Sequence, residues 1–142
     1  MNQVDFESVI PSEEQIVRLF ELLEQRLHRI SCEEVDFSKH EYFVKSHPYR
    51  DWFLIRFNNS YIGSFYVSNE NTIGINLSDE YTSIVVPCII RFVKRNYKPL
   101  PAIPSVRSGN FAINVPPTNV YLASALEAAD AKIAQITYFL PS

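Results

Sequence analysis

The sequence predicts an α/β (α+β) domain with a mixed, mostly antiparallel central sheet and helices on both faces. Three observations predict this class. Strand-like runs separated by short turn-rich spacers occupy the middle of the chain, segments with helical periodicity lie on either side of them, and the C-terminal part has the pattern of a strand, a helix and a strand. Clustered strands ahead of such a unit favour a mixed sheet covered by helices.

The chain begins with a strand pattern and a capped helix. Residues 4–9 alternate apolar and polar side chains, which is typical of a short strand with one buried face. Ser12 and Gln15 then form a capping box that predicts the start of a helix. The apolar side chains of this helix recur at helical spacing as Ile16, Leu19, Phe20, Leu23, Leu27 and Ile30.

A second capping box, from Ser38 to Glu41, predicts a shorter helix. This helix must end before Pro48, because the residue that precedes a proline avoids the α region. Three strand-like runs follow at residues 52–57, 61–67 and 72–77. Their spacers are rich in Asn and have hairpin length, so an antiparallel meander is predicted.

The second half of the chain completes the order of elements. Residues 83–97 keep helical spacing, and Pro87 is expected in the first turn, where a proline is tolerated. A strand at 111–115, an alanine-rich helix at 119–131 and a last strand at 132–140 follow. The predicted order is β-α-α-β-β-β-α-β-α-β.

Composition and charge exclude several classes of function. A chain of 142 residues fits one domain, residues 1–142. The net charge of −3 gives no basic surface for nucleic acid. The first residues do not resemble a signal peptide and the apolar runs are too short for a bilayer, so a cytoplasmic location without membrane contact is expected. Cys32 and Cys88 lack the spacing of metal ligands, so no metal site is expected.

Two stretches of the sequence carry family motifs. The first comprises residues 47–55 (HPYRDWFLI), 61–67 (YIGSFYV) and 73–75 (IGI). The second is NVPPTN at 114–119, followed by Glu127, Lys132 and QITY at 135–138. Together they resemble the GNAT superfamily of N-acyltransferases, in particular its small bacterial single-domain members: the first resembles the central meander, and the second the Asn-initiated helix and final strand.

The resemblance implies that acetyl-CoA lies where the fourth and fifth strands splay apart, and that an amine attacks its thioester directly. It implies main-chain contacts to pantetheine from residues 75–77, a pyrophosphate that faces residues 82–86, and an asparagine beside the cofactor. The candidate cofactor-binding residues are Ile75, Leu77, Thr82, Ser83, Ile84, Val85 and Asn119. The acceptor would be a small-molecule or peptide amine, and the protein a monomer or a homodimer.

The sequence departs from the family at the phosphate loop. The family pattern Gln/Arg-x-x-Gly-x-Gly/Ala would fall on Thr82, Val85 and Pro87, and none of the three matches. Val85 brings a β-branched side chain to the place of the phosphate oxygens, and Pro87 has no N–H. Leu126 stands where many members have a tyrosine that protonates the thiolate, and Asp130 replaces a helix-ending glycine.

No catalytic residue is assigned from the sequence. Glu70 and Asp79 flank the fourth strand and could take a proton from an amine, or could be solvated loop carboxylates. Tyr121 or water could supply the missing acid. Three functions stay open: an acetyl-CoA-dependent N-acyltransferase, a non-catalytic binding or regulatory module of the same fold that has lost its CoA site, and a dimeric subunit that uses residues 84–86 as an interface.

Overall fold

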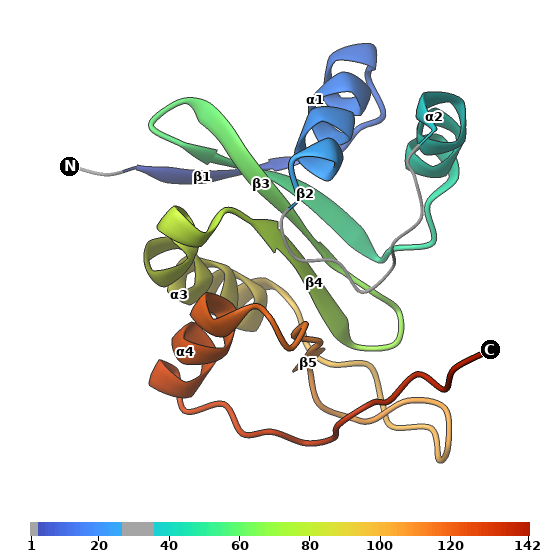
Figure 1. The fold of residues 1–142 in the computed structure, drawn as a ribbon, viewed down its shortest axis with the longest axis vertical. Helices are drawn as coiled ribbons and strands as arrows, with labels where there is room; N and C mark the ends of the chain where they lie inside the picture. The colour runs from blue at the N-terminus through green and yellow to red at the C-terminus, as the bar shows by residue number, and fades with distance from the viewer. Residues whose placement is uncertain (1–2, 27–35) are drawn as a thin grey trace.

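The structure is a computed structural model that describes residues 3–26 and 36–142 (Figure 1). Its elements in chain order are β1 (Val4–Ser8), α1 (Glu13–Glu24), α2 (Phe37–Ser46), β2 (Asp51–Phe57), β3 (Ser60–Val67), β4 (Thr72–Leu77), α3 (Asp79–Asn96), β5 (Ala112–Ile113) and α4 (Val120–Ala128). The strands form one sheet in the order β1-β2-β3-β4-β5, antiparallel except for the parallel β4–β5 pair. In Figure 1, α1 and α2 lie on one face and α3 and α4 on the other, which confirms the predicted fold class.

The meander β2-β3-β4 follows the predicted boundaries to within one residue. Its turns depend on asparagines with positive φ: Asn58 and Asn59 at 48° and 71° between β2 and β3, and Asn71 at 64° before β4. Asparagine tolerates this left-handed region better than other residues with a Cβ, because its short polar side chain can form local hydrogen bonds. The Asn-rich spacers therefore allow the tight turns between β2 and β3 and between β3 and β4.

Side-chain alternation along β2 supplies both cores. Phe53 and Ile55 face α3 and pack with Phe65 of β3, whereas Leu54 faces α1 and packs with Ile16. Each such fully buried side chain contributes roughly 1.5–3 kcal/mol to stability. The sheet is thus covered on both faces, as its apolar runs require.

The joint between β1 and α1 combines the predicted cap with a buried glutamine. The Ser12 hydroxyl accepts a hydrogen bond from the Gln15 amide at 3.3 Å, which confirms the cap. The Gln15 side chain is buried, accepts from the Ile10 amide at 2.8 Å and donates to the Ser8 carbonyl at 2.9 Å. The helix ends at Glu24. Its predicted continuation through Leu27 and Ile30 lies outside the described residues, as does Cys32.

Two predicted helix starts are wrong. The N-cap of α2 is Asp36, whose carboxylate accepts from the amides of Ser38 and Lys39, so Ser38 lies inside the helix. Helix α3 starts at Asp79, about two turns before Pro87, which is therefore an interior residue. Pro87 is exposed, so its ring projects into solvent and does not disturb the packing of α3 against the sheet.

The predicted last strand is also wrong. Residues 132–140 form no strand, and no backbone hydrogen bond connects them to another element within the described residues. The sheet ends at β5. No helix among the described residues has the length and apolar character needed to cross a bilayer.

Candidate functional site

The sheet opens between β4 and β5. These two strands pair only at Thr72–Ala112 and Ile73–Ile113, although β4 continues to Leu77. The Ala112 amide donates to the Asn71 carbonyl at 2.9 Å. Since alternate residues of a strand direct their main-chain groups to the same side, Ile75 and Leu77 also face β5, beyond the point where pairing ends. We call this place the β4–β5 opening.

The α3–α4 side of the opening is apolar. Val86 of α3 and Leu122 and Ala125 of α4 form a buried cluster, against which Ile75 and Leu77 pack. The side chains of Ile75 and Leu77 are therefore structural, and their main-chain groups are the part that a ligand in the opening can reach.

A pair of stacked tyrosines lies on the other face of the sheet, where the ring of Tyr66 covers Gly74 of β4. Tyr66 stacks on Tyr49 with ring centroids 3.8 Å apart, and its ring covers Gly74 so closely that a Cβ there would lie 2.0 Å from it. Burial raises the pKa of both phenols, and for Tyr66 the charge of Glu70 adds to the effect, so both stay protonated at neutral pH. Tyr66 lies on β3 and Tyr49 between α2 and β2, so the stacked pair joins two segments that the sequence alone does not place together.

Helix α3 begins at the end of β4, without an intervening loop. Ser78 is its N-cap, and the Thr82 hydroxyl donates to the Ser78 carbonyl at 3.0 Å. Thr82, Ser83, Ile84 and Val85 lie in the helix, where amides bond to carbonyls one turn earlier. In the first turn, the Tyr81 amide donates to the Ser78 carbonyl at 3.1 Å, and the Glu80 amide can face an external acceptor.

The side chains of that helix segment divide between core and solvent. Thr82 and Val85 are buried, with Val85 in the cluster under the sheet, whereas Ser83 and Ile84 are exposed. Asp79 and Glu80 occupy the first turn, where their charges stabilise the helix and oppose an approaching phosphate. The basic side chains of α3 lie at its other end, and an 18-residue helix is about 27 Å long.

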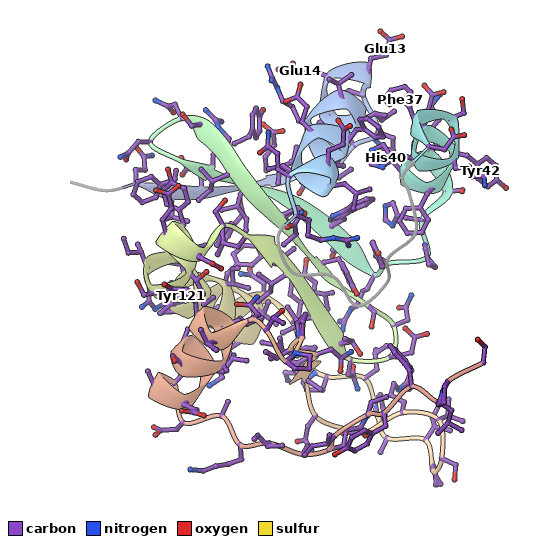
Figure 2. All side chains as sticks on the ribbon, in the orientation of Figure 1. Glu13, Glu14, Phe37, His40, Tyr42 and Tyr121 are labelled. Atoms are coloured by element: carbon purple, nitrogen blue, oxygen red, sulfur yellow. The ribbon has the colours of Figure 1, made fainter. Side chains whose placement is uncertain are left out.

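Asn119 lies between β5 and α4, at the start of the helix whose Leu122 packs with Ile75 and Leu77. It is the N-cap of α4, and its side-chain oxygen accepts from the Leu122 amide at 3.1 Å. Its amide nitrogen is left to donate to a ligand. Tyr121, in the first turn of α4, is 54% exposed (Figure 2).

The two residues that depart from the family at the end of α4 have structural explanations. Leu126 packs into the apolar cluster between α3 and α4. Asp130 has a φ of 64°, the left-handed conformation that glycine usually adopts after a helix.

The two candidate bases lie at opposite ends of β4. Asp79 starts α3, next to the β4–β5 opening, whereas Glu70 is exposed in the turn that precedes β4. Asp79 is therefore the candidate base at the end of β4 where the strand is unpaired. No group of three His, Cys, Asp or Glu side chains that could hold a metal ion occurs in residues 3–26 and 36–142.

Two surface cavities lie away from the opening. One, of about 340 Å³, lies between α1 and the β2–β3 turn, beside Arg18 and Tyr61. The other, of about 390 Å³, is a shallow hollow lined by the loop of residues 102–108. Neither is lined by a residue that the sequence singled out for the cofactor.

The sequence matches no protein-family model and no curated protein. Solved structures do match over nearly the whole chain. AAC(6')-Iy in complex with the bisubstrate analog CoA-S-monomethyl-acetylneamine aligns with a TM-score of 0.64 at 10% identity, covering 99% of this chain and 98% of that one.

Two further structures show the same likeness. The aminoglycoside acetyltransferase meta-AAC0020 from an uncultured soil metagenomic sample, in complex with trehalose, has a TM-score of 0.58 at 9% identity and covers 98% and 95% of the two chains. A possible acetyltransferase from Clostridium difficile 630 has a TM-score of 0.56 at 10% identity and covers 98% and 97%. The chain therefore has the fold of the GNAT acetyltransferases.

Proposed function

We propose that the protein is an acetyl-CoA-dependent N-acyltransferase that acetylates an amine. The observation that carries the proposal is the β4–β5 opening, where the main-chain groups of Ile75 and Leu77 face a gap in the sheet. The amide groups of pantetheine can pair with a strand edge in the way that an extended peptide does. AAC(6')-Iy, which has the same fold, binds a CoA-containing analog.

The other cofactor contacts follow from the neighbouring elements. Asn119 donates from its amide nitrogen while its oxygen caps α4. The pyrophosphate meets the start of α3, where the Glu80 amide and the helix dipole favour it. Thr82, Ser83, Ile84 and Val85 then contribute by forming the helix that presents this turn, not through amides of their own.

The reaction is a direct transfer. The lone pair of a neutral amine attacks the thioester carbonyl, the C–S bond breaks, and the amine loses a proton to Asp79 or to water. The thiolate takes a proton from Tyr121 or from water. The acceptor is a small-molecule amine that approaches over the Tyr49–Tyr66 pair, as the complexes of related folds with sisomicin and with a neamine analog favour. We place the reaction in the cytoplasm.

A non-catalytic module that has lost its CoA site is the second candidate. Two carboxylates, Asp79 and Glu80, stand where phosphate would bind, and the helix starts too early to leave a phosphate loop. Under this candidate the same fold serves only to bind a partner.

Calorimetric titration with acetyl-CoA separates the two candidates. The acyltransferase predicts saturable binding near micromolar concentration. Glu80→Gln should tighten binding about two- to fivefold, because it removes one charge from the first turn of α3. Glu13→Gln is the matched control: this exposed glutamate opens α1 on the other face of the sheet (Figure 2). Absence of heat at about millimolar acetyl-CoA would refute the acyltransferase.

Asn119→Ser tests the remaining contact. Serine also caps helices, so α4 should keep its stability, whereas the donor to the ligand is lost. Binding should weaken about five- to tenfold, the equivalent of one hydrogen bond. An affinity equal to that of the unaltered protein would exclude Asn119 from the cofactor site. Release of free thiol from acetyl-CoA in the presence of amines then identifies the acceptor.

A further inference from the structure

Basic side chains gather at the C-terminal end of α3. Four of them are exposed and belong to the last turns of the helix or to the residues that follow it, and a fifth comes from the residue before β2. We call this group the basic patch, and its members are Arg50, Arg91, Lys94, Arg95 and Lys98. Within residues 3–26 and 36–142, no carboxylate forms an ion pair with any of them.

Contacts with the end of the helix bring Arg50 to the basic patch. Its guanidinium donates to the Lys98 carbonyl at 2.9 Å and lies over the Tyr97 ring, 5.1 Å from the ring centroid. The Tyr97 hydroxyl in turn donates to the Asp51 carboxylate at 2.5 Å. Cations from two distant segments therefore converge, and the carboxylate that lies beside them is already bound by a hydroxyl.

Helix stability explains only part of this arrangement. A cation in the last turn interacts favourably with the helix dipole, but the effect falls off within that turn. Lys94 and Arg95 lie in the last turn, whereas Arg91 precedes it and Arg50 comes from another segment. The basic patch is also separate from the proposed cofactor site, since α3 is about 27 Å long and the β4–β5 opening lies at its other end. Gathering like charges in this way costs free energy in the single chain.

The surroundings of the basic patch favour a short acidic protein segment over a membrane or a nucleic acid. Between residues 85 and 102 no large apolar side chain is exposed. Helical surfaces that bind membranes combine cations with apolar side chains that enter the bilayer. The whole chain carries a net charge of −3, so that the part outside the basic patch is strongly acidic. A long polyanion such as DNA is repelled by that part, whereas a short segment meets only the basic patch.

We propose that the basic patch binds an acidic segment of a partner protein, in which several Asp or Glu side chains lie close together. Arg91 and Arg95 can each bind a carboxylate through two parallel hydrogen bonds. The lysines of the basic patch add point charges beside them. Exposed ion pairs are individually weak and are screened by salt, so the association is transient. It leaves the β4–β5 opening free and does not depend on acyl transfer.

Fluorescence anisotropy tests the proposal on the full chain, with a short labelled peptide of alternating Glu and Gly as the probe. Binding should be saturable and should weaken at least about tenfold between about 50 and 300 mM NaCl. The combined substitution Lys94→Gln and Arg95→Gln should weaken binding at least about fivefold. The matched control, Lys39→Gln with Lys45→Gln, removes the same charge from exposed positions of α2 and should leave the affinity within about twofold. Near-ultraviolet circular dichroism should show that both variants keep the fold.

Two further probes identify the source of the negative charge. Vesicles of phosphatidylcholine with about 30% phosphatidylserine represent a membrane, and short duplex DNA represents a nucleic acid. Neither should bind more tightly than the acidic peptide in the same buffer. Four results would overturn the proposal: no saturable binding of the peptide at about millimolar protein, binding that salt does not weaken, equal weakening by the two double variants, or tighter binding of vesicles or DNA.

Discussion

Asn71 holds the start of β4 to the long loop that leads into β5. Its side chain is fully buried and forms three hydrogen bonds to main-chain groups of that loop. The amide nitrogen donates to the carbonyls of Leu100 at 2.9 Å and Ser108 at 2.7 Å, and the side-chain oxygen accepts from the Leu100 amide at 2.7 Å. Asn71→Ala removes all three hydrogen bonds and leaves their partners unsatisfied.

The expected loss of stability follows from these contacts. Each lost hydrogen bond costs about 1 kcal/mol, and more where its partner stays buried. Alanine also disfavours the φ of 64° at this position by about 1 kcal/mol. We expect Asn71→Ala to lower the free energy of unfolding by about 4 kcal/mol, a large part of the 5–15 kcal/mol of a typical domain. Asn71→Gly, which relieves only the backbone, should recover about 1 kcal/mol of that loss.

Urea unfolding followed by the fluorescence of Trp52, the only tryptophan, measures these differences. Asn110→Ala is the matched control, because Asn110 lies in the same loop with an exposed side chain. It should change the free energy of unfolding by less than about 0.5 kcal/mol. A loss below about 1.5 kcal/mol for Asn71→Ala, or a loss equal to that of the control, would refute the reasoning.

Three further perturbations test other joints of the fold by the same urea unfolding. Gly74→Val should cost at least about 2 kcal/mol, because the new side chain must displace the Tyr66 ring; a neutral result would contradict the close approach. Gln15→Leu should cost about 2 kcal/mol, since it leaves buried main-chain partners of Gln15 unsatisfied, and an unchanged midpoint would count against that role. His40, which lies on α2 toward α1 (Figure 2), has its pKa lowered by burial although its ring nitrogen bonds to the Ile16 carbonyl. The folded state therefore binds fewer protons, stability falls as pH drops below about 6.5, and His40→Gln should flatten that slope; an unchanged slope would exclude His40 as its source.

The sequence predicted those elements whose signals are local. The cap at Ser12, the apolar spacing of α1 and the Asn-rich turns at 58–59 and 69–71 each depend on residues a few positions apart. These features needed no knowledge of distant parts of the chain.

The errors arose where distant parts of the chain decide the outcome. Pro87 suggested a helix start because a proline breaks an isolated helix, but packing of Val85 and Ile89 against the sheet holds α3 together across it. The alternation in residues 132–140 does encode a strand pattern, yet a strand forms only where an edge is within reach. Sequence pattern alone cannot show which edge that is.

The early start of α3 links these observations to function. Because Ser78 connects β4 directly to α3, the structure has no glycine-rich loop at this place, and a phosphate here would meet the start of the helix. Its first turn combines a favourable dipole with the unfavourable charges of Asp79 and Glu80. The opening itself, with the main chain of Ile75 and Leu77, does not depend on this turn. Under the proposed function, we therefore expect the pantetheine contacts to be kept and the phosphates to bind weakly, so a smaller acyl-pantetheine thioester should bind with nearly the affinity of acetyl-CoA. Calorimetry with acetyl-pantetheine measures this directly, and an affinity for acetyl-CoA about 100-fold higher would show that the first turn of α3 binds phosphate despite its two carboxylates.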